Sequence, residues 1–160
     1  MSFLRYLMLL AVVFWLGGLI FFSFVVAPTS FAVLPTRHLA GSVVSRSLTV
    51  LHWMGIVSGL VFVLSSLFYS RFTTGSAHLF AARHILIVIM LVLTCISQFA
   101  ISPRMARLRA TAGEIDRLSL NDPVRAEFNA LHVWSTRLEG SVLLAGMVLV
   151  YATAQSLANR

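Results

Sequence analysis

The chain is 160 residues long, with 59% hydrophobic residues, 11% charged residues and a mean hydropathy of +0.92. A soluble domain carries about 25% charged residues, and disorder requires low hydrophobicity with high charge, so both classes are excluded. All twelve basic residues are Arg, and five acidic residues leave a formal net charge of +7. The composition predicts an integral membrane protein, and the length allows a single transmembrane domain over residues 1–160.

The excess of Arg does not indicate nucleic-acid binding, because no polar module with base-reading side chains accompanies it. Membrane proteins keep Arg in loops, where it sets orientation and meets anionic headgroups. Cys95 is the only cysteine, so neither an intramolecular disulfide nor a thiolate metal cage can form. We therefore expect the lipid bilayer, and no nucleic acid, as the partner of the chain.

Four apolar windows follow one another along the chain, each long enough to cross a hydrocarbon core of about 30 Å as a helix. The first exceeds the apolar region of a signal peptide, which has about 7–15 residues, so we expect it to be retained. Backbone groups must be hydrogen-bonded internally in lipid, so the spans are helices. The predicted spans are about 6–27, 47–70, 85–102 and 134–158.

The third loop, 103–133, is the longest polar stretch. After Pro103 its apolar residues recur at spacings of three and four, which predicts an amphipathic helix along the membrane surface. Asp122 and Pro123 form a favourable N-cap and first-turn pair for a helix that continues into the fourth span. The predicted fold class is all-α: an antiparallel four-helix bundle with an interfacial helix between spans three and four.

Arg residues are distributed unevenly between the two ends of this predicted bundle. The first and third loops, with Arg137 at the adjoining start of the fourth span, carry eight, whereas the second loop and the two termini together carry four. The positive-inside rule counts basic residues near the span ends, so the first and third loops are expected in the cytoplasm. The expected location is a bacterial inner membrane, with both termini outside the cytoplasm.

Two histidines are predicted to lie at similar depth near the cytoplasmic end. Trp53 and Trp134 are typical of an interfacial aromatic belt, and His52 and His132 are close to them in sequence. Such histidines bond the backbone or headgroups, bind metal or haem, or handle protons and anions. The sequence leaves these alternatives open, with His52 and His132 as the candidate metal ligands and haem or copper as the candidate cofactor.

A carboxylate stands at the edge of the fourth span. His132, Ser135 and Glu139 share one helix face at spacings of three and four, and an acid at membrane depth is a functional candidate that needs a partner. We expect Arg104 or Arg46 to be that partner; a structural ion pair or a snorkelling carboxylate is the alternative. A catalytic triad is not predicted, because one helix face supplies no nucleophile elbow and no oxyanion donors. The candidate polar cluster is His52, Arg104, His132, Ser135 and Glu139.

Small residues mark the helix contacts that we expect. Gly55 and Gly59 form a GxxxG step in the second span, and Gly17 and Gly18 are adjacent in the first. Glycines at such positions let helices approach closely, either inside the bundle or between protomers.

Several short motifs occur in a fixed order along the chain. They are Trp15-x-Gly17-Gly18, Ala27-Pro28, Leu34-Pro35, Gly41, Leu51-His52, Pro103-Arg104, and Phe128 with His132-Val133-Trp134-Ser135. Together they resemble the transmembrane protein 205-like family, catalogued as domain of unknown function 4149, which implies a four-span membrane protein without an established activity. The Trp15-x-Gly17-Gly18 helix and the membrane histidines are more remotely similar to the copper-resistance D-like superfamily, whose members handle copper or haem.

These observations support three functional hypotheses. The first is a non-enzymatic bundle whose polar cluster at the cytoplasmic face binds a partner, a lipid headgroup or a small solute. The second is a haem- or copper-binding membrane protein that uses His52 and His132 as ligands. The third is a transporter of a small solute or metal, which with four spans requires a homo-oligomer or another membrane protein to complete a pathway.

Overall fold

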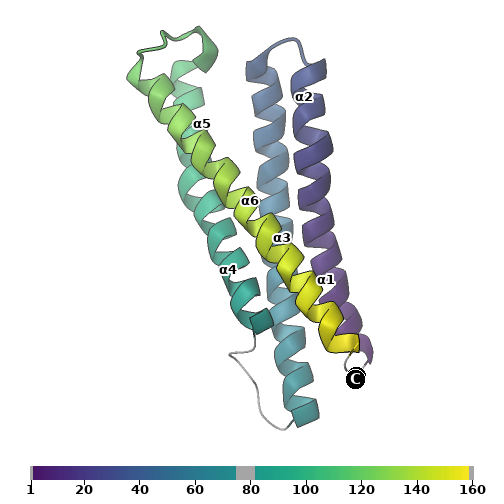
Figure 1. The fold of residues 1–160 in the computed structure, drawn as a ribbon. Coiled ribbons are helices and arrows are strands. Elements are labelled where there is room, and N and C mark those ends of the chain that lie inside the picture. Colours follow the sequence, from purple (N-terminus) through teal and green to yellow (C-terminus); the bar gives the residue numbers. More distant parts are fainter. Residues whose placement is uncertain (1, 75–81, 159–160) are drawn as a thin grey trace.

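The structure is a computed structural model that describes residues 2–74 and 82–158, and every regular element in these ranges is a helix (Figure 1). Three of the elements are short: two π-helical turns, η1 and η2, and the 3-10 turn η3. In chain order the elements are α1 (Ser2–Phe21), η1 (Phe22–Val26), α2 (Ala27–Val33), α3 (Arg37–Thr74), α4 (Ala82–Ile96), η2 (Ser97–Ile101), α5 (Ser102–Ala112), η3 (Ile115–Arg117) and α6 (Pro123–Ala158).

Four helical segments are long and apolar enough to cross a membrane: Ser2–Val33, Arg37–Phe72, His84–Ala112 and Pro123–Gln155. The predicted all-α bundle of four spans is therefore confirmed, and the protein is an integral membrane protein. Large apolar side chains cover much of its outer surface, as expected of helices that face lipid instead of water.

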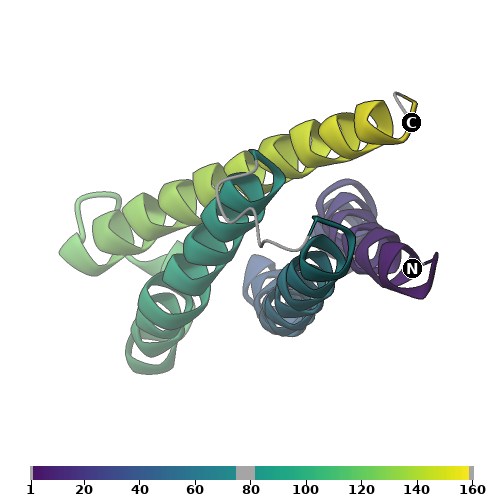
Figure 2. The ribbon, with the colours of Figure 1, turned by 90° about the horizontal axis from the view of Figure 1, so that it is seen from below.

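The bundle consists of two antiparallel hairpins. The segment from α1 to α2 packs along α3, and the segment from α4 to α5 packs along α6. Figure 1 shows the turn between α2 and α3 and the loop between α5 and α6 at one end, while Figure 2 shows the hairpins side by side from the other end. The buried core between them contains Trp15, Phe62, Met90 and Val142. We call the end with the turn and the loop the loop end.

The predicted glycine contacts lie in the first hairpin, and Gly59 also meets Leu91 of the second, 2.5 Å from an added Cβ. A Cβ atom at Gly55 would lie 2.5 Å from Nε1 of Trp15, and one at Gly59 would lie 2.9 Å from the same indole ring. The GxxxG step thus seats the buried Trp15 between α1 and α3, and Gly18 approaches side chains of α3 as closely. Gly17 has no atom within 4 Å of an added Cβ, so the structure gives it no packing role.

The two π-helical turns lie just before the prolines of spans one and three. A proline lacks the backbone N–H and its ring clashes with the carbonyl four residues earlier. In η1 the N–H of Ala27 donates to the carbonyl of Phe22, five residues earlier, and η2 repeats this pattern. The wider turn accommodates Pro28 and Pro103, so neither span breaks at its proline.

The helix predicted after Pro103 is present, and it is continuous with the third span. It is present as α5, but α5 follows η2 without interruption and so extends the third span beyond the predicted end at residue 102. It ends at Gly113, whose φ of 67° suits glycine. Asp122 caps α6 as predicted, because its Oδ1 accepts the backbone N–H of Val124 at 2.8 Å.

Candidate functional site

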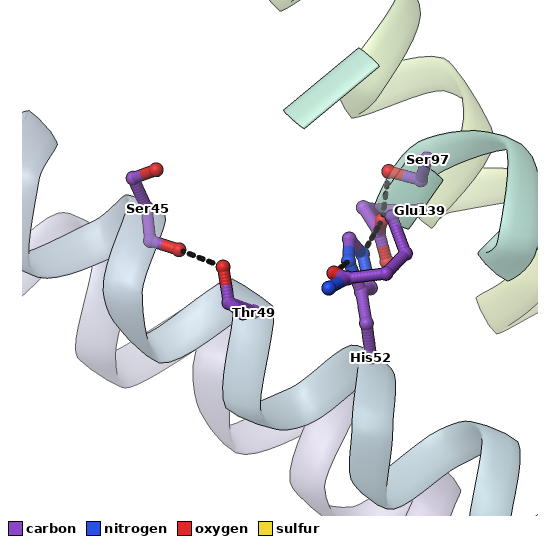
Figure 3. A network of polar contacts seen from close by, with 6 residues as sticks. Ser45, Thr49, His52, Ser97 and Glu139 are labelled. Atoms are coloured by element: carbon purple, nitrogen blue, oxygen red, sulfur yellow. Dashed lines mark hydrogen bonds and ion pairs between the residues drawn. The ribbon is translucent and has the colours of Figure 1, made fainter. Parts of the chain in front are cut away.

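The centre of the candidate site is a pair of side chains that joins the two hairpins. His52 of α3 is only 1% exposed, and its Nε2 lies 2.7 Å from Oε1 of Glu139 in α6. The hydroxyl of Ser97 in η2 donates to the same oxygen at 3.0 Å, and Nδ1 of His52 lies 2.8 Å from Oε1 of Gln98. Figure 3 shows the side chains of His52, Ser97 and Glu139 meeting between their helices. We call these four residues the inter-hairpin cluster.

The number of shared protons explains how these polar groups can lie inside a membrane bundle. Oε1 of Gln98 is an acceptor, so Nδ1 of His52 donates to it, and one further proton lies between Nε2 and Oε1 of Glu139. The pair is then an imidazolium with a carboxylate, or a neutral imidazole with a carboxylic acid. Both forms carry no net charge, which avoids the large cost of an isolated ion at membrane depth.

The π-helical turn brings two consecutive residues of span three into this cluster. Ser97 and Gln98 are the first residues of η2, and both reach the His52–Glu139 pair. Consecutive side chains of an α-helix point about 100° apart at 3.6 residues per turn, and π-helical turns often occur at functional sites. Neither residue was predicted from the sequence, although Pro103 was a signal that the helix deviates nearby.

Arg104 is not the partner of Glu139. Its Nε lies 2.6 Å from Oε1 of Glu127, and both side chains of that pair are exposed to solvent, at 63% and 38%. The expected Arg104–Glu139 pair is therefore replaced by the His52–Glu139 pair, and Arg104 lies outside the inter-hairpin cluster.

A cavity of about 450 Å³ lies next to Glu139. His132, Ser135 and Glu139 contribute to its wall from α6, as their predicted common face requires, and most of the remaining wall is apolar. Both hydrogen bonds of the Glu139 carboxylate use Oε1; within the described ranges Oε2 has no hydrogen-bond partner. We call this space the main cavity. It brings three of the five predicted cluster residues together, and His52 reaches it through Glu139.

Arg109 is a further candidate, which the sequence alone indicated only as a loop residue. Its Nη1 donates to the backbone carbonyl of Gly41 at 2.8 Å, and its guanidinium lies 5.0 Å above the ring of Phe128. A Cβ atom at position 41 would lie 2.6 Å from the guanidinium, so any other residue there would shift Arg109 from this position. Arg109 borders the main cavity and a smaller one of about 160 Å³.

The two predicted metal ligands have different surroundings, since His52 is buried in the inter-hairpin cluster and His132 borders the main cavity. Both ring nitrogens of His52 are already engaged by Gln98 and Glu139, so neither has a free lone pair for a metal in this arrangement. Within residues 2–74 and 82–158, no three His, Cys, Asp or Glu side chains are grouped so that they could hold a metal ion.

The fold and the site define an integral membrane four-helix bundle with a buried polar cluster beside a cavity. Residues 10–114 match the family described as Domain of unknown function (DUF4149), and the chain belongs to this family. It is 39% identical over 102 residues to an uncharacterized protein of Aquifex aeolicus (strain VF5), which covers 64% of this chain and 69% of that protein. No solved structure matches the chain. His52, Gln98 and Arg109 lie within the matched range, and Glu139 follows it.

Proposed function

We propose that this protein is a non-enzymatic membrane bundle that binds a small hydrogen-bonding ligand, a solute or a lipid headgroup, in the main cavity. The observation that carries the proposal is that Glu139 takes part in two features at once. Its Oε1 belongs to the inter-hairpin cluster, and the same side chain borders a cavity that is otherwise mostly apolar.

The main cavity has the properties of a ligand site. Binding pockets have volumes of about 300–1,000 Å³ and combine apolar walls with a few polar groups that fix the ligand's orientation. Here Ser135, His132 and Glu139 supply such groups on neighbouring turns of α6. A ligand with a hydrogen-bond donor would satisfy Oε2 of Glu139, which has no partner within the described part of the chain.

Native mass spectrometry of the protein purified in mild detergent tests this proposal. We expect a bound small molecule on the wild-type protein, reduced occupancy in Glu139→Gln and unchanged occupancy in Glu127→Gln. The control removes a carboxylate from the same helix, but Glu127 pairs with Arg104 outside the main cavity. Equal occupancy in both variants, with both still folded by circular dichroism, would contradict the proposal.

A transport role in an oligomer is the second candidate, and one observation favours it. Spans one and three both contain a π-helical turn followed by a proline, and π-helical turns often occur at functional sites. Uptake into proteoliposomes of a solute identified by the binding experiment tests this role. Uptake that is absent while binding is intact would leave the protein as a binding bundle.

The haem or copper hypothesis requires His52 to give up one of its present contacts. The remote resemblance to copper-resistance D-like proteins favours this hypothesis, whereas the resemblance to transmembrane protein 205-like proteins implies no particular activity. Absorption spectroscopy and elemental analysis of protein from metal-replete cells test it: a Soret band or stoichiometric copper that disappears in His52→Ala and His132→Ala would support the histidines as ligands. Unchanged metal content in both variants would reject them.

The proposed location is a bacterial inner membrane with the loop end in the cytoplasm. Support comes from the distribution of Arg, eight in the first and third loop regions against four elsewhere. Labelling of single cysteines placed at residues 36 and 120, in a Cys95→Ser background, would report the side of each position. Labelling of these positions from outside intact cells would show that the orientation is the opposite of the proposed one.

A further inference from the structure

We propose that the ligand is an anionic phospholipid with a hydroxyl in its headgroup: the phosphate lies beside Arg109, which borders both cavities, the hydroxyl donates to Oε2 of Glu139, and an acyl chain follows the apolar wall of the main cavity. This inference rests on the proposed function and names the chemical class of its ligand. It begins from the two cavities, which share Phe31, Gly41, Arg109 and His132 as wall residues.

The two cavities differ in chemistry as the two parts of a lipid do. The apolar wall of the main cavity includes Phe22 of η1, Pro28 of α2, Leu48 of α3 and Leu143 of α6. The smaller one, which we call the cationic cavity, is bordered by Arg37, His38, Arg109, His132 and a single acid, Asp116. Two guanidinium groups against one carboxylate give the cationic cavity a positive charge, which complements a phosphate.

Arg109 is held in place without an acidic partner. Its half-buried guanidinium is fixed by the carbonyl of Gly41 and the ring of Phe128, neither of which carries a negative charge, and Asp116 acts on it electrostatically without forming an ion pair. No carboxylate of the described residues lies within 4 Å of it. The ion pairs in the described part of the chain are His52–Glu139, Arg104–Glu127 and Arg117–Glu114. Such a cation needs an anion, and the planar guanidinium offers paired N–H donors to phosphate.

The position in the fold identifies the source of the phosphate. The cationic cavity is formed at the loop end, by residues near the start of α3, the end of α5 and η3. A phosphate bound there as part of a lipid places its chain in the neighbouring apolar cavity, whereas a free phosphate leaves that cavity unexplained. The bilayer supplies lipids with this combination at the depth where the helices leave the hydrocarbon.

The experiment compares lipids with matched chains. Delipidated protein in detergent is titrated with phosphatidylglycerol, with phosphatidylcholine of the same acyl chains, and with inorganic phosphate, and bound masses are followed by native mass spectrometry. We expect phosphatidylglycerol to bind about tenfold or more tightly than phosphatidylcholine, because both carry a phosphate but choline adds a positive charge close to Arg37 and Arg109. Arg109→Gln should remove this preference and Arg104→Gln should keep it, because Arg104 lies on the same helix but borders neither cavity.

The remaining outcomes separate this inference from the proposed function. Equal binding of the two lipids overturns the anionic class and leaves the main cavity as a ligand site. Binding of inorganic phosphate alone, lost in Arg109→Gln, overturns the lipid as its source. No binding of any probe overturns the phospholipid as ligand, and the comparison of the wild-type protein with Glu139→Gln then decides the proposed function by itself. If Arg109→Gln fails to fold, Arg37→Gln replaces it, since Arg37 is exposed and borders only the cationic cavity.

Discussion

The His52–Glu139 pair makes a quantitative prediction about the contact between the two hairpins. Replacing Glu139 by Leu leaves Nε2 of a His52 that is 1% exposed without a partner. Breaking a buried pair from one side costs about 3–5 kcal/mol. Because the Glu139 side chain is 13% exposed, we expect the lower end of this range, about 3 kcal/mol, for Glu139→Leu.

Replacing His52 by Leu is expected to be less costly. Glu139 then keeps the hydrogen bond from Ser97 and borders the main cavity, so it is less isolated than His52 would be. An unsatisfied buried group costs about 1–3 kcal/mol, and we expect about 2 kcal/mol for His52→Leu. The double variant removes both partners, so it should lose about 3 kcal/mol rather than the sum of about 5 kcal/mol.

The coupling of about 2 kcal/mol that these values imply is measured by a double-mutant cycle. Unfolding in detergent by increasing sodium dodecyl sulfate, followed by tryptophan fluorescence, gives the free energies. The matched control is the Arg104–Glu127 pair, whose N–O distance is similar but whose side chains are exposed; its coupling should stay below about 1 kcal/mol. Equal coupling for both pairs, or strict additivity at His52 and Glu139, would refute the reasoning.

Two further predictions concern the packing and the capping of single helices. Gly59→Leu should destabilise the protein by at least about 1–3 kcal/mol by displacing Trp15, whereas Gly17→Leu, which meets no atom within 4 Å, should change stability by about 0.5 kcal/mol or less; the midpoints of detergent unfolding compare the two. Asp122→Ala removes the cap on the N–H of Val124 and should cost about 1 kcal/mol; a midpoint equal to that of the wild type would show that this cap contributes nothing.

The spans could be predicted from sequence because the bilayer imposes one strong requirement. Every backbone group in hydrocarbon must be bonded internally, so each long uncharged window became a helix. The ends of the helices were harder to predict from the sequence. Charged residues after 102 mark where the hydrocarbon ends, but the third helix continues to Ala112, since its backbone hydrogen bonds remain satisfied in polar surroundings.

The pairing within the site could not be predicted in the same way. Periodicity placed His132, Ser135 and Glu139 on one face, and the structure places them on one cavity wall. Which helix that face meets depends on how the helices rotate against one another, which a single sequence does not contain. One extra residue in a turn rotates the rest of the helix by about 100°, so η2 also hid the contributions of Ser97 and Gln98 from a regular helical pattern.

The position of Glu139 links ligand binding to the contact between the hairpins. Its Oε1 accepts from Ser97 and contacts His52, while the carboxylate also borders the main cavity. A ligand that bonds Oε2 withdraws charge from Oε1 and so changes the strength of both contacts. Coupling between two equilibria is reciprocal. If the ligand changes the equilibrium constant of the His52 contact by some factor, loss of that contact changes the ligand affinity by the same factor. The proposed binding site therefore includes the inter-hairpin cluster, even though His52 does not line the cavity.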